Sequence, residues 1–466
     1  MIEARSFAGK SAAVFGMGMS GIAAAKSLLA GGAKALVWDD GERGREAAQA
    51  AGLPLSDLHE ADWSALDALV LAPGVPLTHP EPHWTVEAAR VHGVEVIGDT
   101  EIFIRERKAS GTAAKVIAIT GTNGKSTTTA LTHHILSSIG LDAVLGGNIG
   151  KAVLDLPPFA DGRYYVIEFS SFQLDLTPSL DADAAILLNV TPDHIDRHGS
   201  LESYAAVKET IFKRARAAVI GADDGFCNAI AERAIAQGVQ TFRISANHPV
   251  SNGIYAEGTE LFEVEDGAIR NRASLKGIGS LRGAHNAQNA SAALAACRSL
   301  GLPWDKLAGA LASFPGLAHR MEEVRRIGHV LFVNDSKATN ADAAERALLS
   351  FSNIYWIAGG KAKEGGITSL APYFPKIKKA YLIGHSAEDF AATLGQAVPY
   401  ALTKTLDRAV AEAAADAAAD GTGEAVVLLS PACASYDQFP NFEVRGTAFR
   451  ALAEALPDGP AKDRAG

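Results

Sequence analysis

The stretch Ile-Ala-Ile-Thr-Gly-Thr-Asn-Gly-Lys-Ser-Thr-Thr-Thr, residues 117–129, decides the fold of this chain. Its apolar start predicts a strand, Gly121 to Gly124 predict a tight bend, and the hydroxyl run after Lys125 predicts the start of a helix. Glycines let the backbone curl so that several N–H groups point at one anion. The helix start adds its free N–H groups and the positive end of its dipole. The stretch therefore predicts a strand–loop–helix unit that binds phosphate.

The side chains of this loop suit a nucleoside triphosphate and its metal ion. Lys125 can bridge phosphate oxygens, and Ser126 or Thr127 can offer a hydroxyl to Mg²⁺. The usual spacing G-x-x-x-x-G-K-[ST] would require Gly at position 119, which is Ile here. We therefore interpret the loop as a short variant, with an ordinary glycine turn before a helix as the alternative. The predicted phosphate-binding residues are Gly121, Thr122, Asn123, Gly124, Lys125, Ser126 and Thr127.

Length and composition restrict the class of protein. The 466 residues are enough for about three domains at roughly 150 residues each. A net charge of −10 argues against a general nucleic-acid binder, which needs a basic surface. No stretch approaches the roughly 20 apolar residues of a membrane helix, and the start does not resemble a signal peptide. We expect a cytoplasmic protein without nucleic-acid or membrane partners, and a monomer because no heptad seam is visible.

Alternating strand and helix patterns predict an α/β protein of three domains. We place them at 1–111, a Rossmann-like domain, at 112–316, a P-loop-type ATPase domain with a mainly parallel sheet, and at 317–466, a second Rossmann-like domain. Residues 16–21 match G-x-G-x-x-G, with the acidic Asp39 about 20 positions on, so a diphosphate could lie at this helix start. Gly74 follows another strand at the same predicted edge.

The central domain delivers polar groups at the ends of two further strands. Glu168 and His194 each follow an apolar strand, where they suit direct or water-bridged contacts to Mg²⁺. Lys208 falls on the apolar stripe of a helix, three and four residues after Ala205 and Tyr204. An inward lysine has a lowered pKa, and its neutral amine can react with carbon dioxide or an activated carbonyl. A lysine that keeps its head in water is the alternative.

Two later segments predict further ligand contacts. Asn286 and Asn289, three residues apart on one helix face, suit the edge of a purine, with helix capping as the alternative. In the third domain, strands end in N-D-S-K-A-T-N at 334–340 and S-P-A-C-A-S at 430–435. These polar strand ends predict a second ligand-binding edge.

Taken together, these motifs resemble the Mur ligases, ATP-dependent amide-forming enzymes of peptidoglycan precursor synthesis. The resemblance rests on T-G-T-N-G-K-S-T, G-G-N-I-G, E-F-S-S-F-Q-L, N-V-T-P-D-H-I-D-R-H and the two third-domain motifs. Within the family, the third-domain motifs are similar to those of the members that add D-glutamate to UDP-N-acetylmuramoyl-L-alanine. The resemblance implies an acyl-phosphate intermediate, with ATP and Mg²⁺ as cofactors. The nearest alternatives are another Mur-type ligase and a folylpolyglutamate-like ligase. From other classes, the alternatives are an NAD-dependent oxidoreductase that uses the glycine-rich turn and a non-catalytic nucleotide-binding or switch protein that uses the phosphate loop.

The resemblance also implies a role for each motif residue. The catalytic residues would be Lys125, His194 and Lys208. The metal ligands would be Ser126, Glu168, His194 and a carbamylated Lys208. Beside the phosphate loop, ATP would contact Asn286, Asn289, Arg320 and Asp335. The sugar nucleotide would contact Met19, Ser20, Asp39, Gly74, Asn148 and His194. D-Glutamate would contact Lys337, Thr339, Lys363, Ser435 and Phe442, with Lys361 as the alternative to Lys363.

Overall fold

The computed structural model describes residues 1–421 and 423–457 and divides into two compact units. Unit 1 comprises Met1–Lys276 and Ala284–Phe314, and unit 2 comprises Gly277–Gly283 and the chain from Pro315 onward. Residues 458–466 of the predicted third domain lie outside the described residues. The boundaries predicted at 111/112 and 316/317 remain predictions.

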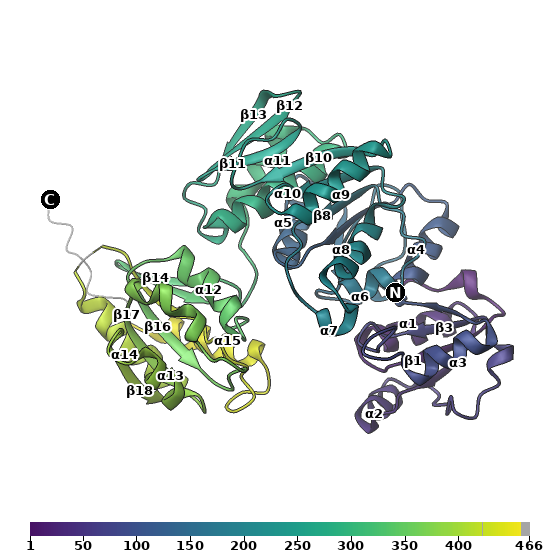
Figure 1. Ribbon diagram of the computed structural model, residues 1–466, viewed down its shortest axis with the longest axis horizontal. Coiled ribbons are helices and arrows are strands. Elements are labelled where there is room, and N and C mark those ends of the chain that lie inside the picture. The colour runs from purple at the N-terminus through teal and green to yellow at the C-terminus, as the bar shows by residue number, and fades with distance from the viewer. Residues whose placement is uncertain (422, 458–466) are drawn as a thin grey trace. The chain divides into compact units, whose positions relative to one another are not determined.

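The first sheet of unit 1 has four parallel strands in the order β2-β1-β3-β4. Figure 1 labels β1 and β3 of this sheet together with helices α1, α2 and α3. Its strands are β1 Ser11–Phe15, β2 Lys34–Trp38, β3 Ala68–Leu71 and β4 Glu95–Ile97. Its helices are α1 Met19–Ala30, α2 Glu42–Ala50, α3 Trp84–His92 and α4 Asp99–Ser110. Strands β1 and β3 place alternate residues in two separate cores, Val14 and Val70 in one and Phe15 and Leu71 in the other. Both faces are therefore covered, as a parallel sheet requires.

The second sheet of unit 1 has nine strands in the order β13-β12-β11-β10-β9-β8-β5-β7-β6. They are β5 Lys115–Thr120, β6 Ala143–Gly147, β7 Tyr164–Glu168, β8 Ala184–Leu187, β9 Ala217–Gly221, β10 Gln240–Ser245, β11 Gly253–Glu257, β12 Glu260–Glu265 and β13 Ala268–Ser274. All pairs are parallel except β11–β12 and β12–β13, which form two antiparallel hairpins.

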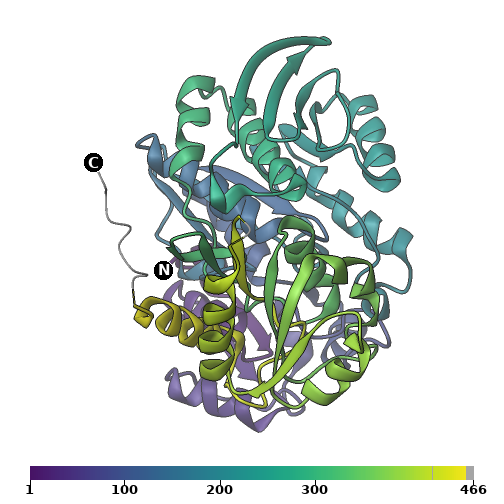
Figure 2. The ribbon, with the colours of Figure 1, turned by 90° about the vertical axis from the view of Figure 1, so that its left-hand side faces the viewer.

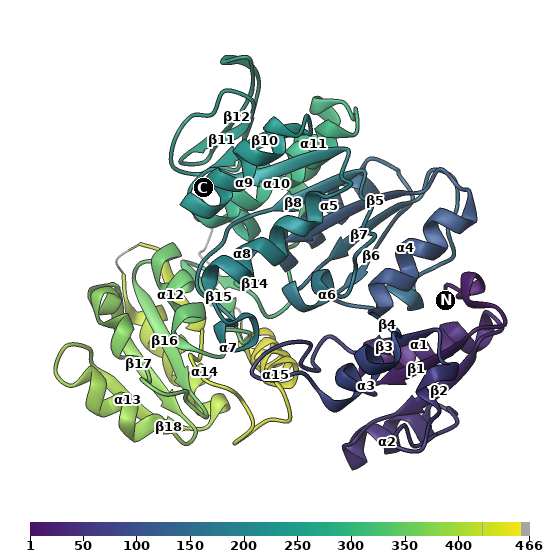
Figure 3. The same ribbon diagram turned by 45° about the vertical axis from the view of Figure 1, so that its right-hand side comes forward.

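Helices surround this second sheet, with α5 and α10 packed together (Figure 3). They are α5 Lys125–Ser138, α6 Ser171–Asp175, α7 Ile195–His198, α8 Leu201–Glu209, α9 Gly225–Ala236, α10 Ala284–Ser299 and α11 Trp304–Ala310. Strands β8, β5 and β7 are parallel neighbours, so their carboxyl ends meet at one edge. The phosphate motif follows β5, Glu168 is the last residue of β7, and His194 lies in the segment after β8.

Unit 2 contains a six-stranded sheet in the order β14-β15-β19-β16-β17-β18. Its strands are β14 Glu322–Ile327, β15 Val330–Asn334, β16 Ile354–Gly359, β17 Ile377–Ile383, β18 Tyr400–Lys404 and β19 Ala425–Leu429. Only β14 pairs antiparallel. One face packs against α12 Ala341–Ser350 and α13 Ala387–Leu394, the other against α14 Leu406–Ala419 and α15 Phe442–Ala455. Figure 2 gives a second view of these strands and of the yellow helix α15.

The predicted fold class is confirmed, since all three sheets are mainly parallel and alternate with helices. Within the ranges that the structure describes, every helix is too short or too polar to cross a membrane.

Candidate functional site

The phosphate loop between β5 and α5 can be built only with glycine at two positions. Gly121 and Gly124 have φ angles of +155° and +85°, which L side chains rarely adopt. A Cβ on Gly124 would also lie 2.4 Å from the Asn289 side-chain oxygen. The loop can thus pack closely against α10 while the first turn of α5 presents its backbone N–H groups.

The segment after β8 holds this loop in place. The Thr122 N–H donates to the Asn189 carbonyl at 2.9 Å, and the Asn123 N–H donates to the Asn189 side-chain oxygen at 2.8 Å. The Thr122 hydroxyl donates to the Thr191 carbonyl at 3.1 Å. The sequence reasoning missed Asn189, although an amide directly after a buried strand and before T-P-D-H could have indicated it.

Two lysines converge on one carbonyl of the loop. Lys125 Nζ donates to the Gly121 and Thr122 carbonyls at 2.9 and 2.8 Å. Lys208 Nζ donates to the same Gly121 carbonyl at 2.9 Å and to the Thr120 hydroxyl at 3.3 Å. Lys208 is only 1% exposed, so the predicted inward direction is confirmed. Burial, assisted by the nearby Lys125 charge, lowers the pKa of Lys208 to about 7.

Glu168 presents one oxygen that no group of the described chain satisfies. Its side chain is buried, and Oε1 accepts a hydrogen bond from Asn148 Nδ2 at 2.9 Å. Oε2 is buried without a hydrogen-bond partner among the described residues. A buried carboxylate oxygen without a donor is costly, whereas a bound cation would stabilise it.

The predicted metal ligands fit a hard, water-rich ion. No three His, Cys, Asp or Glu side chains within residues 1–421 and 423–457 gather into a metal-binding group. Mg²⁺ binds through one or two carboxylates and completes its shell with water and phosphate oxygens. The unsatisfied Glu168 oxygen beside the phosphate loop meets that requirement. The assignment of Ser126, His194 and Lys208 as ligands remains a prediction.

His194 lies in a sparsely populated backbone conformation next to an aromatic ring. Its φ is +52°, and its ring centroid lies 5.0 Å from that of Phe172 on α6. Arg197 covers the same ring at 4.6 Å and donates from Nη1 to the Gly74 carbonyl at 3.0 Å. Phe172 and Arg197 therefore connect His194 with Gly74, which was predicted to contact the sugar nucleotide.

A buried histidine, His198, links two short helices, α7 next to His194 and α6 shortly after Glu168. His198, at the end of α7, makes a hydrogen bond from Nε2 to the Ser171 hydroxyl at 2.9 Å. Its ring stacks on Phe172 at 5.4 Å with an interplanar angle of 6°. Burial is the main cause that lowers the pKa of His198 to about 4, so the ring is neutral at physiological pH. The sequence reasoning assigned this residue no role.

Asn286 and Asn289 come together on one face of α10, as predicted. The Asn289 amide donates to the Asn286 side-chain oxygen at 3.1 Å and accepts from the Thr128 hydroxyl at 3.2 Å. Both asparagines are at least nine-tenths buried. Asn289 thus supports the start of α5, a contact that the predicted role in reading adenine did not include. The adenine role remains a prediction.

The glycine-rich turn of the first sheet is fixed by Asp39. Its two carboxylate oxygens accept from the Met17 and Gly41 N–H groups at 2.6 and 2.8 Å. Met19 and Ser20 are the first two residues of α1, with Met19 exposed and Ser20 half-buried. The turn and the helix start form the predicted diphosphate position, and Asp39 shapes it through the backbone.

An aromatic cluster beside this turn was not predicted from the sequence. Trp84 donates from Nε1 to Asp40 at 2.8 Å, and the His59 ring stacks on Trp84 at 3.9 Å. Arg45 donates to the carbonyls of Asp39 and Asp40 at 2.8 and 2.6 Å. These side chains come from separate segments, so spacing along the chain could not group them. The cluster supplies planar surfaces and charge at the carboxyl end of β2.

In unit 2, Asp335 is buried where β15 ends. It accepts from the Ser430 hydroxyl at 2.8 Å and from the Met321 N–H at 3.1 Å. Burial raises the pKa of Asp335 to about 7, although these hydrogen bonds and the Arg320 charge oppose the shift. Arg320 precedes Met321 in the chain, so the structure brings these two predicted nucleotide contacts close together.

The residues predicted to hold D-glutamate surround the ends of three strands in unit 2. Lys337 Nζ lies over the Phe442 ring at 4.6 Å, and the Thr339 N–H donates to the Lys337 carbonyl at 2.9 Å. Lys361 pairs with Ala434 through two backbone hydrogen bonds of 2.9 and 3.0 Å, next to the buried Ser435. Lys361 and Lys363 are both exposed, so the choice between them remains a prediction.

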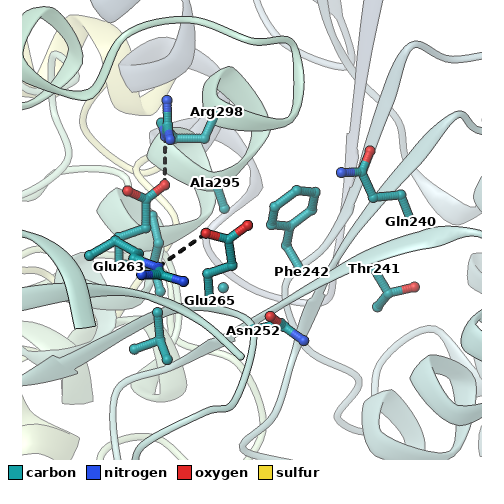
Figure 4. A pocket seen from close by; sticks show the side chains of 12 residues that line it. Gln240, Thr241, Phe242, Asn252, Glu263, Glu265, Ala295 and Arg298 are labelled. Atoms are coloured by element: carbon teal, nitrogen blue, oxygen red, sulfur yellow. Dashed lines mark hydrogen bonds and ion pairs between the residues drawn. The ribbon is translucent and has the colours of Figure 1, made fainter. Parts of the chain in front are cut away.

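A separate cavity of about 360 Å³ lies in unit 1 around β10, β11 and β12 (Figure 4). Two ion pairs span its wall, Arg298–Glu263 at 2.5 Å and Arg270–Glu265 at 3.1 Å. None of the predicted site residues lines this cavity.

Comparison with known proteins gives matches along the whole chain. Three family models match: the Mur ligase MurD-like N-terminal domain at 10–98, the Mur ligase middle domain at 119–297, and the Mur ligase glutamate ligase domain at 319–433. Relatives named UDP-N-acetylmuramoylalanine–D-glutamate ligase are 59% identical in Mesorhizobium japonicum and 57% in Rhizobium meliloti and Brucella abortus. Each alignment covers 98% of this chain and 98% of the relative.

Solved structures show the same fold at low sequence identity. The UDP-N-acetylmuramate-alanine ligase of Thermotoga maritima is 19% identical with a TM-score of 0.57, covering 96% of this chain and 99% of that one. A UDP-N-acetylmuramoyl-L-alanyl-D-glutamate–2,6-diaminopimelate ligase is 18% identical with a TM-score of 0.58, covering 98% and 95%. With three family models and full-length relatives above half identity, the chain belongs to the Mur ligase family.

Proposed function

We propose that the chain is an ATP-dependent ligase that joins D-glutamate to UDP-N-acetylmuramoyl-L-alanine in peptidoglycan precursor synthesis. The relatives that carry this activity in their names align over almost the full chain. The observation that carries the proposal lies at the ends of β5, β7 and β8. There, Lys125 and the buried Lys208 converge on the phosphate loop beside the Glu168 Oε2 atom, which has no hydrogen-bond partner within the described ranges.

The first step transfers a phosphoryl group. A carboxylate oxygen of the alanyl group attacks the γ-phosphorus of ATP, the bond to ADP breaks, and an acyl phosphate forms. The ammonium group of Lys125 neutralises oxygen charge on the transferred group. It already reaches the loop carbonyls at 2.8–2.9 Å, so a small movement of its flexible stem brings the ammonium to a bound phosphate. Asn148 and His194 would position the sugar nucleotide.

Lys208 contributes through its neutral amine. The amine attacks carbon dioxide, a new N–C bond forms, and one proton is released to solvent. The resulting carbamate is an oxygen ligand in place of a cation, which reverses the local charge. Mg²⁺, when bound by Ser126, Glu168, His194 and the carbamate, would neutralise the phosphate oxygens.

The second step forms the amide. The amine of D-glutamate attacks the acyl carbon, a tetrahedral intermediate forms, and phosphate leaves with the C–O bond electrons. The groups proposed to hold D-glutamate are Lys337, Thr339, Lys363, Ser435 and Phe442. Arg320 and Asp335 would contact the nucleotide, as Asn286 and Asn289 would. An NAD-dependent oxidoreductase would use the glycine-rich turn but would leave Lys208 and Glu168 without a role.

Release of ADP tests this function. The purified full-length chain receives ATP, Mg²⁺ and D-glutamate, with and without UDP-N-acetylmuramoyl-L-alanine. We expect ADP release and amide product only when both substrates are present. ADP release that does not depend on D-glutamate would contradict the proposal. Formation of product with a folate in place of the sugar nucleotide would contradict it as well. We further propose that the chain acts in the cytoplasm and that it is a monomer. Light scattering on the purified protein measures its mass and so tests the oligomeric state.

A further inference from the structure

Arg445, on the first turn of α15, is one of the largest fully buried side chains of the molecule. Its Nε donates to the Ser336 hydroxyl at 2.9 Å. Its Nη2 donates to the carbonyls of Ser336 and Cys433 at 2.8 and 3.0 Å. Its Nη1 is buried and has no hydrogen-bond partner in the described part of the chain.

A guanidinium in this position is expensive for the folded state. No carboxylate among the described residues lies within ion-pair distance of Arg445, whereas buried cations usually have such a partner. Asp437 and Asp335 act on it only through their charges, which partly oppose the effect of burial on the pKa of Arg445. Burial lowers the pKa of Arg445 to about 10, so the group is still charged at neutral pH. Apolar side chains of similar volume are often neutral or stabilising in place of buried charges. Stability alone therefore does not explain a buried guanidinium that lacks a direct ion pair.

The guanidinium lies where three strand ends of unit 2 meet. Ser336 follows β15, Cys433 follows β19, and Gly360 follows β16. Gly360 has a φ of +130°, and a Cβ there would lie 2.4 Å from the Ala434 carbonyl and 3.4 Å from Arg445 Nη1. The segment after Gly360 is joined to Ala434 by the Lys361 backbone pair. Arg445 thus holds two of these segments directly and abuts the third.

These segments carry the groups proposed to bind the amino acid. Lys337 directly follows Ser336, and Ser435 lies two residues after Cys433. The Ser336 hydroxyl also donates to the Phe442 carbonyl at 2.8 Å, so Phe442 belongs to the same hydrogen-bonded group. A shift of either carbonyl that accepts from Arg445 would move the neighbouring side chains with it.

We infer that Arg445 is a positioning residue for an amino-acid substrate with two carboxylates. Its hydrogen bonds fix the backbone segments that carry Lys337, Ser435 and Phe442, the groups proposed to bind this substrate. The inference rests on the proposed function, because it names the group that selects the second substrate. Lysine cannot replace arginine fully, because an ammonium lacks the planar fork that serves several acceptors at once.

The test is the steady-state kinetics of Arg445→Lys in the full-length chain. We expect the KM for D-glutamate to rise about tenfold for each net hydrogen bond lost, while kcat and the KM for ATP change less than about twofold. Arg445→Met, which also removes the charge, should raise this KM further. Arg450→Lys is the matched control on the same helix, since Arg450 is partly exposed and pairs with Glu322. It should leave all three constants unchanged.

The other possible results distinguish a wrong inference about Arg445 from a wrong proposed function. An unchanged KM for D-glutamate in Arg445→Lys would overturn the inference. A fall in kcat with an equal rise in every KM and a lower melting temperature would also overturn it. Should Arg445→Lys fail to fold, Ser336→Ala removes one acceptor of Arg445 and leaves the two carbonyls. A rise in the KM for D-glutamate of about fivefold would then support the inference, and no change would overturn it. Wild-type protein that does not use D-glutamate would instead contradict the proposed function.

Discussion

Lys208 on α8 and Arg445 on α15 are both buried cations that contact segments at the carboxyl ends of parallel strands, one in the second sheet of unit 1 and one in the sheet of unit 2. Each donates to backbone carbonyls, and neither has a carboxylate partner in the described ranges. Burial brings the pKa of Lys208 to about 7, within reach of neutral pH, but leaves the pKa of Arg445 at about 10. The same kind of environment therefore gives a reactive neutral amine at Lys208 and a fixed positive charge at Arg445. The residue type decides whether a buried cation can become a nucleophile.

The largest expected effect comes from removing the titratable amine. Lys208→Ala should lower kcat by about a thousandfold, because the proposed carbamate and its charge on the phosphate groups are lost. Added short carboxylic acids should restore part of the rate, since they can occupy the space of the carbamate. Lys208→Arg, which keeps the charge but cannot form a carbamate, should be as inactive as the alanine variant.

The control for this prediction is Lys213→Ala. Lys213 is exposed and lies shortly after α8, so its removal should leave the rate unchanged. A Lys208→Ala enzyme with wild-type turnover would show that the buried amine has no part in the reaction. The different pKa values of Lys208 and Arg445 would then have no consequence for catalysis.

The next effect concerns the unsatisfied oxygen of Glu168. Glu168→Gln keeps the Asn148 contact but removes the negative charge, so the Mg²⁺ concentration for half-maximal rate should rise on the order of tenfold to a hundredfold. Titration of the rate with Mg²⁺ measures the shift, with the exposed Glu202→Gln as the control. An unchanged Mg²⁺ requirement would remove Glu168 from the ligand set. The effect of Arg445→Lys on the KM for D-glutamate is expected to be smaller still.

Much of this site could be predicted from the sequence because its parts are local. The phosphate loop, Glu168 and His194 each follow an apolar strand, and parallel strands bring such ends together. Lys208 was predicted inward because helical periodicity places it with Tyr204, and it is buried. Its carbonyl partner could not be predicted, since Gly121 lies on a distant segment.

The missed residues share a physical reason. Asn189 and His198 act through hydrogen bonds to segments that only the tertiary structure brings near. Arg445 follows Glu443 and Val444 at the start of a helix, where an arginine normally faces solvent. Periodicity reports which face is apolar, not which charged group is enclosed by three loops.

The smallest expected effect is on stability at acidic pH. His198 is neutral when folded, since its pKa falls from the ordinary 6.5 to about 4. Between these values the unfolded chain binds a proton that the folded chain does not, so stability falls as the pH drops through this window. The contribution is at most about 1.4 kcal/mol per pH unit.

Urea unfolding at pH 5 and pH 7 measures this effect. His198→Phe keeps the ring against Phe172 and should lose less stability between the two pH values than the wild type. His92→Phe, at an exposed position at the end of α3, should behave as the wild type does. Equal pH dependence in all three proteins would mean that His198 titrates normally.

The contrast between the two buried cations is tested most directly at Lys208 itself. Wild-type protein equilibrated with ¹³C-labelled bicarbonate at pH 8 should show a carbamate carbon resonance by NMR, and Lys208→Met should lack it. Arg445→Met should keep the signal, because its guanidinium is not the reacting group. A wild-type spectrum without a carbamate resonance, or one that persists in Lys208→Met, would contradict the account.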